Sequence, residues 1–353
     1  MTANQTLDMD KLNAFVGRLV GDIGAAMSAA LVLIGDQLGL YKALAQGEMT
    51  PAELAAKTGT NERYVREWLG NQAACDYIAY NPATGKYSMT PEQVMVFADE
   101  SSPAFMPGAF QVVSAVAHGV PRMMEKFKSG GGVLWGDQHV HLFEGTERFF
   151  RSGYKANLVS SWIPALAGVK EKLEKGARVT DIGCGHGAST ILMAQAFPNS
   201  KFVGVDFHKP SIEAARDRAA KAGLKNCTFE VAGSTDYAGE KFDLACCFDC
   251  LHDMGDPVGC AKHVLKSLAP DGTWMIVEPM AADDVKGNLN PVGRVFYAAS
   301  TMICVPNSLA GEGAALGAQA GEKKLTEVIK KGGFTKVRRA TETPFNMILE
   351  AKP

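Results

Sequence analysis

The residues best suited to chemistry in this chain lie in and directly after a short apolar segment, 178–182. Asp181 lies inside this segment, and Gly183, Gly185 and Gly187 follow it at alternate positions. Alternate glycines allow a tight turn and let a ligand approach the backbone closely, because glycine has no Cβ. The amides at the start of a following helix would face that ligand with a partial positive charge. The pattern therefore predicts a strand, a ligand-binding turn and a helix that begins near Gly187.

Two nucleotide ligands could use such a turn. A dinucleotide site prefers the spacing G-x-G-x-x-G, with a pyrophosphate on the helix N-terminus. Here the spacing is G-x-G-x-G, and the carboxylate of Asp181 would be unfavourable beside a pyrophosphate. It suits a ligand with a positive centre, such as the amino group and sulfonium of S-adenosylmethionine (SAM). Asp206, which ends the next apolar segment, can bind both ribose hydroxyls in either kind of ligand, so it does not discriminate between them.

The stretch D-I-G-C-G-H-G at residues 181–187 resembles motif I of the class I SAM-dependent methyltransferases. The resemblance covers residues 147–353 well and residues 10–100 loosely, and the small-molecule O-methyltransferases are the most similar group. It implies SAM as the cofactor and S-adenosylhomocysteine as its product. It also implies an α/β fold with a Rossmann-like, seven-stranded sheet whose final strand is antiparallel.

A histidine that could act as a base follows the fourth apolar segment. His252 lies in a stretch similar to the L-H-D-W segment of O-methyltransferases, with Met254 in place of tryptophan, and the family's histidine deprotonates the acceptor hydroxyl. Glu278 matches the glutamate that orients this histidine. A phenol with a pKa near 10 is mostly unionised at pH 7, so a base with a pKa of about 6.5 would help the attack. The alternative is that His252 only caps the helix beginning at Asp256. Gln319 aligns loosely with a second family glutamate and cannot usefully accept a proton.

Further cofactor contacts are expected at the carboxyl ends of the predicted strands and on the helix before the first strand. Phe207 could lie against the adenine ring, and Ser234 takes the place of an acid that often contacts adenine in the family. Tyr154 is the candidate for covering the methionine end of the cofactor, although it could equally be a core aromatic. The complete set of candidate cofactor-binding residues is Asp181, Gly183, Gly185, Asp206, Phe207, Gly233, Ser234, Phe248, Asp249 and Tyr154.

Strand and helix signals alternate from residue 178 onward, which predicts a parallel sheet. A long insertion, residues 280–319, follows the fifth strand, and insertions at this edge are typical of lids or specificity walls. Residues 104–128 are expected to be helical, with interruptions at Pro107-Gly108 and at Pro121. The predicted strands are 178–182, 201–206, 227–232, 242–248, 273–278, 336–341 and 346–351, and the predicted helices between them are about 188–197, 210–223 and 256–268.

Residues 36–100 have the pattern of a winged helix. A capping box at Thr50 begins one helix, residues 61–75 form a helix in the recognition position, and residues 78–89 form a hairpin wing. The segment contains five basic and nine acidic side chains. Because binding to phosphates needs a basic footprint, a structural or dimerising role is favoured over DNA binding. A similar unit precedes the catalytic domain in many small-molecule O-methyltransferases.

Residues 10–34 are predicted to form a helix, either a core helix or a subunit interface. The chain has 353 residues, which is enough for two domains. Its net charge of −2 argues against non-specific affinity for nucleic acids. The polar start, residues 1–10, has no secretory signal, and the longest apolar run, residues 23–34, is too short to span a bilayer. A cytoplasmic protein without membrane contact is therefore expected.

No metal site is predicted. Cys247 and Cys250 lack a second pair of ligands at zinc spacing, and His139 and His141 would share a face only on a strand.

Three regions follow from these patterns: an N-terminal helical and winged-helix domain for dimerisation (1–100), a helical linker and substrate cap (101–170), and a SAM-binding methyltransferase domain (171–353). The function hypothesis is methyl transfer from SAM to a small-molecule acceptor, most simply a hydroxyl, by a homodimer without a nucleic-acid partner. The alternative is a ligand-sensing transcriptional regulator whose winged helix binds DNA.

Overall fold

The structure is a computed structural model that describes residues 7–239 and 241–353. Residues 1–6, which begin the polar start in which no secretory signal is predicted, lie outside the described residues. The chain forms two compact units, Met1–Ser114 and Ala115–Pro353. The boundary falls inside the predicted linker and cap region, whose extent as a separate region remains a prediction.

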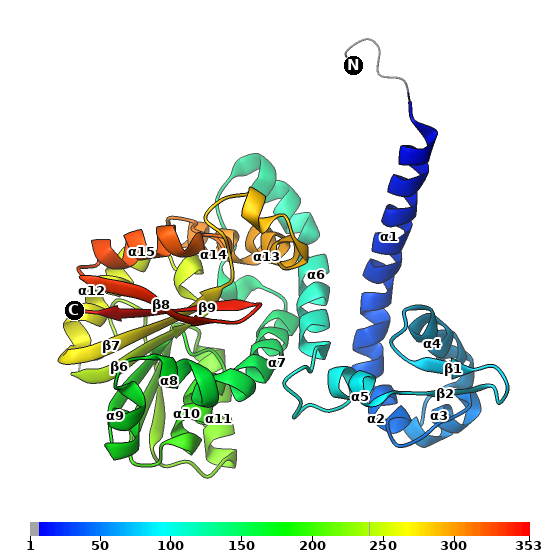
Figure 1. Ribbon diagram of the computed structural model, residues 1–353, viewed down its shortest axis with the longest axis horizontal. Coiled ribbons are helices and arrows are strands. Elements are labelled where there is room, and N and C mark those ends of the chain that lie inside the picture. The colour runs from blue at the N-terminus through cyan, green and yellow to red at the C-terminus, as the bar shows by residue number, and fades with distance from the viewer. Residues whose placement is uncertain (1–6, 240) are drawn as a thin grey trace. The chain divides into compact units, whose positions relative to one another are not determined.

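The first unit is the predicted winged helix (Figure 1). The capping box is present, because Thr50 Oγ1 accepts the Glu53 amide and a Glu53 carboxylate oxygen accepts the Thr50 amide over 2.7 Å. Asn61 caps the helix in the recognition position. The elements are α1 (Met9–Gln37), α2 (Leu40–Leu44), α3 (Pro51–Thr58), α4 (Glu62–Ala74), the wing strands β1 (Ala79–Asn81) and β2 (Lys86–Ser88), and α5 (Pro91–Phe97).

Helix α1 packs on the winged helix near its C-terminal end. Near its C-terminal end, the Trp68 indole donates a hydrogen bond to the Leu31 carbonyl over 2.8 Å, and a Cβ at Gly35 would lie 2.4 Å from the Trp68 ring. Almost all residues from Met9 to Met27 are exposed. The helix has 29 residues and is largely apolar, so by length and composition it could cross a membrane. The prediction that the apolar run is too short to span a bilayer considered only residues 23–34. It does not hold for α1, because the apolar helix extends well beyond that run.

The second unit contains a seven-stranded sheet in the order β5-β4-β3-β6-β7-β9-β8, which confirms the Rossmann-like α/β prediction. Strands β3 to β7 are parallel, and β9 is antiparallel to both of its neighbours. Strand β7 begins earlier than predicted, because the Pro270-Asp271-Gly272 sequence forms an irregularity inside the strand and not its boundary. The strands are β3 (Arg178–Ile182), β4 (Lys201–Asp206), β5 (Cys227–Val231), β6 (Phe242–Phe248), β7 (Leu268–Pro279), β8 (Lys336–Glu342) and β9 (Asn346–Lys352).

Helices cover both faces of this sheet (Figure 1). Alternate residues of β6 show why its sequence is continuously apolar: Leu244 and Cys246 pack into one core cluster, and Ala245 and Cys247 pack into the other. The carboxyl ends of β3, β4 and β6 are thereby fixed between two buried layers. The covering helices are α9 (Val169–Lys175), α10 (Ala188–Ala196) and α11 (Lys209–Lys221) on one face, and α12 (Pro257–Ser267) and α15 (Gly321–Lys331) on the other.

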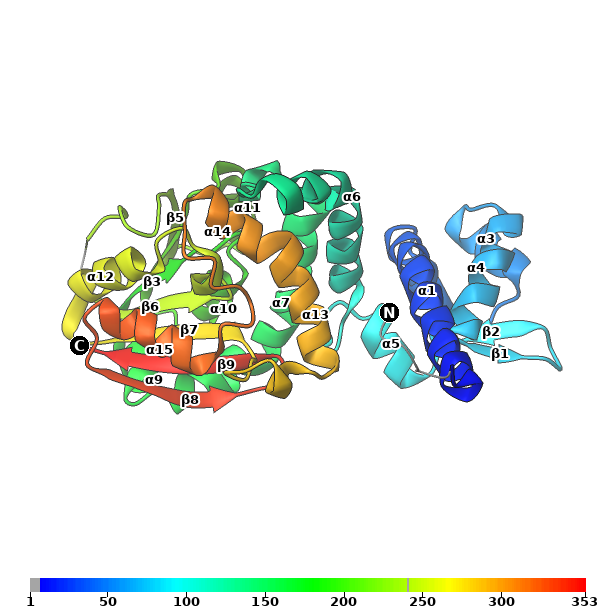
Figure 2. The same ribbon diagram turned by 90° about the horizontal axis from the view of Figure 1, so that it is seen from above.

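Two further segments of the chain are helical. Helix α6 (Pro107–Ser129) begins at Pro107 and continues through Pro121, so the predicted interruption at Pro121 is wrong; an internal proline removes a hydrogen bond and kinks a helix without always ending it. The insertion is largely helical, and α13, η5 and α14 form a nearly continuous rod (Figure 2). The remaining elements are η1 (Trp135–Asp137), α7 (Val140–Asn157), η2 (Leu158–Trp162), α8 (Ile163–Ala165), η3 (Leu251–Asp253), η4 (Lys286–Asn288), α13 (Pro291–Ala299), η5 (Ser300–Cys304) and α14 (Val305–Ala310).

Candidate functional site

A cavity of about 330 Å³ lies at the carboxyl ends of the parallel strands, where the sequence predicts the cofactor. Four of the candidate residues do not line it: Asp181, Gly233, His252 and Glu278. The candidates that do are Gly183, Gly185, Asp206, Phe207, Ser234, Phe248, Asp249 and Tyr154.

The glycine turn has the geometry that its sequence implies. Gly183, Gly185 and Gly187 have φ values of 70°, 51° and 77°, in the left-handed region that favours glycine. A Cβ at Gly183 would lie 2.8 Å from the sulfur of Cys250, whereas no atom lies within 4 Å of a Cβ built at Gly185. The turn is thus closely packed beneath Gly183 and has open space at Gly185, which leaves room for a ligand against the backbone.

Asp206 is fixed at the end of β4 by two backbone amides. Its Oδ2 accepts the Gly185 amide over 3.0 Å, and its Oδ1 accepts the His208 amide over 2.8 Å. Burial raises the pKa of this carboxyl, and the two amide hydrogen bonds oppose the shift. Each oxygen retains acceptor capacity for a donor such as a ribose hydroxyl. Phe207, 58% exposed, presents an aromatic ring beside it.

Asp181 occupies a different place from the one expected. Its Oδ2 accepts hydrogen bonds from the hydroxyls of Ser189 and Thr190, each over 2.6 Å, so the carboxylate lies beneath the turn and not in the cavity. The first turn of α10 supplies both hydroxyls, a contact that the motif alone does not reveal. Burial raises the pKa of Asp181 to about 6. Its Oδ1 is buried without a hydrogen-bond partner among the described residues.

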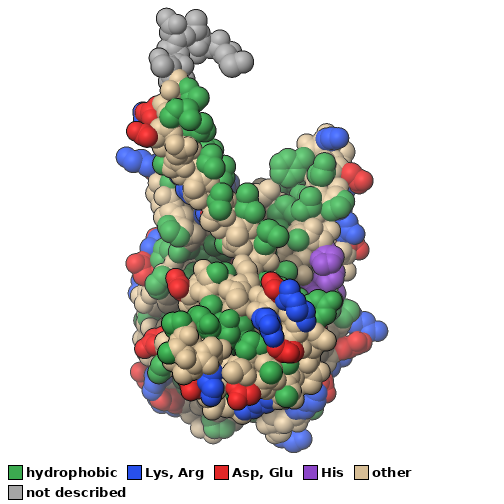
Figure 3. Space-filling view, turned by 90° about the vertical axis from the view of Figure 1, so that its right-hand side faces the viewer, with side chains coloured by type: hydrophobic (Ala, Val, Ile, Leu, Met, Phe, Trp, Pro, Cys, Tyr) green, Lys and Arg blue, Asp and Glu red, His purple; other side chains and the backbone are tan. Residues whose placement is uncertain are grey.

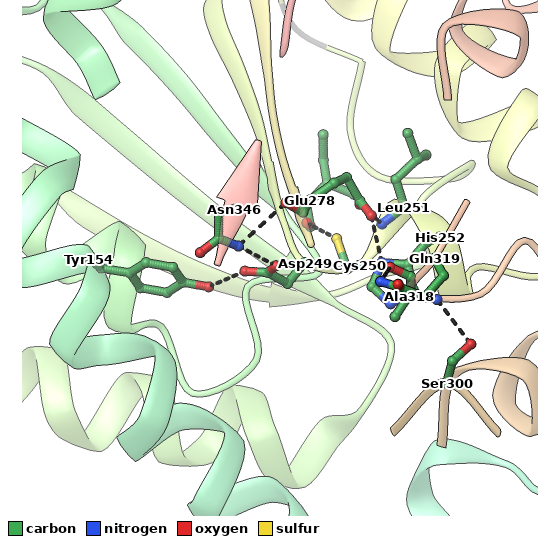
Figure 4. Close-up of polar contacts among 11 residues, drawn as sticks. Tyr154, Asp249, Cys250, Leu251, His252, Glu278, Ser300, Ala318, Gln319 and Asn346 are labelled. Atoms are coloured by element: carbon green, nitrogen blue, oxygen red, sulfur yellow. Dashed lines mark hydrogen bonds and ion pairs between the residues drawn. The ribbon is translucent and has the colours of Figure 1, made fainter. Parts of the chain in front are cut away.

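Tyr154, Asp249 and Asn346 form a polar group at the cavity (Figure 4). The Tyr154 hydroxyl donates to Asp249 Oδ2 over 3.3 Å, and the Asn346 amide donates to Asp249 Oδ1 over 2.7 Å. Tyr154 also packs against Phe248 and Trp162, so its predicted core and site roles are compatible. Sequence reasoning missed Asn346; the signal available was a polar residue directly before the apolar run Met347-Ile348-Leu349.

His252 and Glu278 form a buried pair, as predicted (Figure 4). His252 Nδ1 lies 2.6 Å from Glu278 Oε2, and the other glutamate oxygen accepts the Leu251 amide over 2.9 Å. Burial lowers the pKa of His252, but Glu278 and the neighbouring thiol of Cys304 raise it, and the result lies well above the ordinary value. The capping alternative is wrong, because the Asp256 carboxylate itself caps α12 through the Gly259 amide.

Other cavity-lining residues were not singled out from the sequence. Helix α7 presents Phe143, Glu147 and Phe150 on the same face as Tyr154, at helical spacing. Glu147 is 8% exposed and forms an ion pair with Arg218 at 2.5 Å. Next to His252, the carboxyl of Asp253 also lines the cavity, and burial raises its pKa to about 7. The helical periodicity of α7 was the signal that could have identified its residues.

These residues fit SAM. The cavity volume is in the range of small-molecule sites, and its acidic side chains favour a cationic ligand over a pyrophosphate. Asp206 has the acceptors that ribose hydroxyls need, and Asp249 presents a carboxyl group for a cationic end of the ligand. Among the described residues, no group of three or more His, Cys, Asp or Glu side chains could hold a metal ion.

Family models match a segment in each of the two units. Residues 173–333 match a family model described as a methyltransferase domain, and residues 26–98 match an Rv2258c-like winged HTH domain. The chain is 30% identical over 154 residues to the chloroplastic tocopherol O-methyltransferase of Arabidopsis thaliana, covering 41% of this chain and 44% of that protein. It is 32% identical over 142 residues to the 27-O-demethylrifamycin SV methyltransferase of Amycolatopsis mediterranei, covering 39% and 46%. The chain thus spans less than half the length of these relatives.

The fold is shared over a greater length. Human N-acetylserotonin methyltransferase, solved in complex with SAM, is similar in structure with a TM-score of 0.69 and 16% identity. The similarity covers 100% of this chain and 99% of the human chain. At this identity the likeness shows a common fold.

Proposed function

We propose that this chain, which carries a methyltransferase domain behind a winged helix-turn-helix domain, transfers a methyl group from SAM to a small-molecule acceptor, most simply a hydroxyl. One observation supports this most strongly. A cavity with an open glycine turn and an amide-fixed Asp206 lies directly beside the buried pair of His252 and Glu278. Cofactor-binding groups and a candidate base therefore meet at the same sheet edge.

Each residue has a defined part in this proposal. Asp206 binds the ribose hydroxyls, Phe207 covers the adenine ring, and Asp249 with Tyr154 faces the positively charged methionine end. SAM supplies an electrophilic methyl group on its sulfonium when it is bound. The protein's own contribution is to hold the reactants in line and to exclude water, since effective orientation lowers the barrier to a bimolecular displacement.

His252 accepts the proton of the acceptor hydroxyl. Glu278 binds Nδ1 and thereby leaves Nε2 as the nitrogen that takes the proton, and the carboxylate stabilises the imidazolium that forms. The thiol of Cys304, on η5, lies close to the same imidazole. The insertion therefore covers this side of His252, which is consistent with a specificity wall there.

The direct test is a screen for methyl transfer. The purified chain is incubated with SAM labelled in its methyl group and with sets of phenols, alcohols, amines and activated carbon acids. Labelled product together with S-adenosylhomocysteine confirms the proposal, and the productive set identifies the acceptor class. Tight binding of NAD with no response to S-adenosylhomocysteine would overturn the cofactor assignment.

The regulator alternative predicts that the winged helix binds DNA, and we expect that it does not. The two arginines of α4 are paired within the helix, Arg63 with Glu67 at 2.5 Å and Arg66 with Glu62, which reduces their availability to phosphates. A gel-shift titration at physiological salt should show no sequence-specific complex. A nanomolar complex with one promoter sequence would instead support the regulator.

We expect the chain to form a homodimer in the cytoplasm, with α1 at the interface. Large apolar side chains lie exposed along this helix (Figure 3), and a face of this kind is unusual on a soluble monomer. Introducing charge with Leu19→Glu and Ile23→Glu should produce monomers in sedimentation. The control Ala14→Glu places an acid on the opposite side of the helix and should leave the dimer intact. A monomeric wild-type chain, or its recovery with membranes, would contradict the expectation.

A further inference from the structure

Asn346 lies at the start of β9, where its amide bridges two acidic residues from other strands (Figure 4). The side chain is 6% exposed. Its Nδ2 donates to Asp249 Oδ1 over 2.7 Å and lies 3.5 Å from the backbone oxygen of Glu278. The backbone of Asn346 is fixed in turn by Thr343, whose hydroxyl accepts the Asn346 amide over 3.0 Å and whose own amide donates to the Asn346 carbonyl over 2.8 Å. The side-chain amide of Asn346 is therefore held in a fixed position.

Asp249 adopts an unusual backbone conformation where it meets this amide. Its φ is +52°, in the left-handed region, which is unfavourable for a non-glycine residue. Its amide donates to the Val277 carbonyl over 2.7 Å, so β7 helps to impose the conformation. The side chain lines the cavity, and each of its oxygens has a donor, Tyr154 on one side and Asn346 on the other. The surroundings thus determine both the position and the orientation of this carboxyl.

The charges around Asp249 explain why these donors matter. Burial, and then the charge of Glu278, raise the pKa of Asp249 well above its ordinary value. His252 and the hydrogen bonds from Tyr154 and Asn346 oppose that shift. Asn346 comes from β9, Glu278 from β7, His252 from η3 and Tyr154 from α7, so groups from four elements face the carboxyl.

We propose that Asn346 is a positioning residue that directs the Asp249 carboxylate toward the positive charge of the cofactor's methionine end, and so sets the affinity for the cofactor. This rests on the proposed function, since it requires that the cavity bind SAM and S-adenosylhomocysteine. A cation in the cavity favours the deprotonated carboxylate, and the carboxylate in turn favours the cation. Loss of the Asn346 donor weakens both the orientation and the charge of Asp249.

Calorimetry with S-adenosylhomocysteine tests this from acidic to neutral pH. Asn346→Ala should weaken binding about tenfold near neutral pH, the scale of one hydrogen bond to a charged group. The loss of affinity with falling pH should also begin at a higher pH than in the wild type. Asp249 must be deprotonated to attract the ligand, and the variant raises its pKa further, so protonation interferes sooner as the pH falls.

A double-mutant cycle separates positioning from mere structural support. In an Asp249→Asn background, adding Asn346→Ala should change the affinity little, because the group that Asn346 positions no longer carries charge. The control is Asn226→Ala, which removes hydrogen bonds to three backbone carbonyls away from the cavity and should leave the pH profile unchanged. Additive losses, or an equal loss at every pH, would overturn the proposal. Failure of the wild-type chain to bind S-adenosylhomocysteine at any pH would instead overturn the cofactor assignment itself.

Discussion

Replacement of His252 by alanine is expected to lower turnover about a hundredfold or more, the usual scale for loss of a general base. The imidazole is 4% exposed and held by Glu278 at 2.6 Å, so the variant removes a proton acceptor that is already oriented. Cofactor affinity should fall far less than turnover, because His252 does not line the cofactor cavity and acts on the ligand only through its charge beside Asp249. Steady-state kinetics on the natural acceptor and calorimetry with S-adenosylhomocysteine measure the two effects separately.

The pH profile gives a second readout on His252. A base acts in its neutral form, so the wild-type rate should rise as the pH passes the pKa of this histidine. Although burial opposes it, Glu278 raises that pKa well above the ordinary value, and the limb should therefore lie on the alkaline side of pH 6.5. His252→Ala should lose the limb. The control His263→Ala, on α12 with a hydrogen bond to the Tyr237 carbonyl, should keep it. Full turnover by His252→Ala would make the residue structural and favour an acceptor that needs no base.

Replacement of Asp206 by alanine is expected to weaken the binding of SAM and S-adenosylhomocysteine about a hundredfold, or about 3 kcal/mol. The carboxylate is the acceptor proposed for both ribose hydroxyls, and hydrogen bonds to a charged group contribute about 1.5–3 kcal/mol each. The two amides that bind Asp206, those of Gly185 and His208, would also lose their acceptor. Titration calorimetry on both ligands measures the change directly.

Two further variants separate charge from folding in this experiment. Asp206→Asn keeps the side-chain shape and one oxygen acceptor, and should lose less affinity than Asp206→Ala. Asp217→Ala removes an exposed acid on α11 that pairs with Lys221, and should leave affinity unchanged. Unaltered affinity in Asp206→Ala, with the fold intact by circular dichroism, would show that the ribose does not bind at the end of β4.

Much of the fold could be predicted because its signals are local. The strands β3, β4 and β6 have the predicted bounds, since each is a short apolar run that ends at a polar residue or a turn. The capping box at Thr50 and the wing hairpin are confirmed for the same reason. The predicted strand 273–278 is shorter than β7, because a Pro-Asp-Gly sequence, normally a turn signal, lies within the strand. Helix α6 continues through Pro121, because an internal proline removes one helical hydrogen bond without always ending the helix.

The site was predictable where a motif fixes the backbone and less so where distant elements meet. The glycine turn and the approach of Glu278 to His252 follow from strand order. The position of Asp181 does not, because it depends on side-chain hydroxyls in the first turn of α10. Asn346 approaches Asp249 from 97 positions away, and neither sequence segment indicates the other. Which acceptor enters beside His252 depends on the packing of the insertion, for which no local pattern exists.

The placement of β9 has a consequence for synthesis of the protein. This strand follows all the others in sequence, yet it lies between β7 and β8 and pairs with both. Until β9 has left the ribosome, β7 has an unpaired edge, and such edges invite association with other chains. Asn346 arrives with the same strand, so Asp249 lacks its 2.7 Å partner for as long as that edge is open. A ribosome-bound chain that ends before β9 should therefore fail to retain S-adenosylhomocysteine, and the cavity should become competent for ligand only when the sheet is closed.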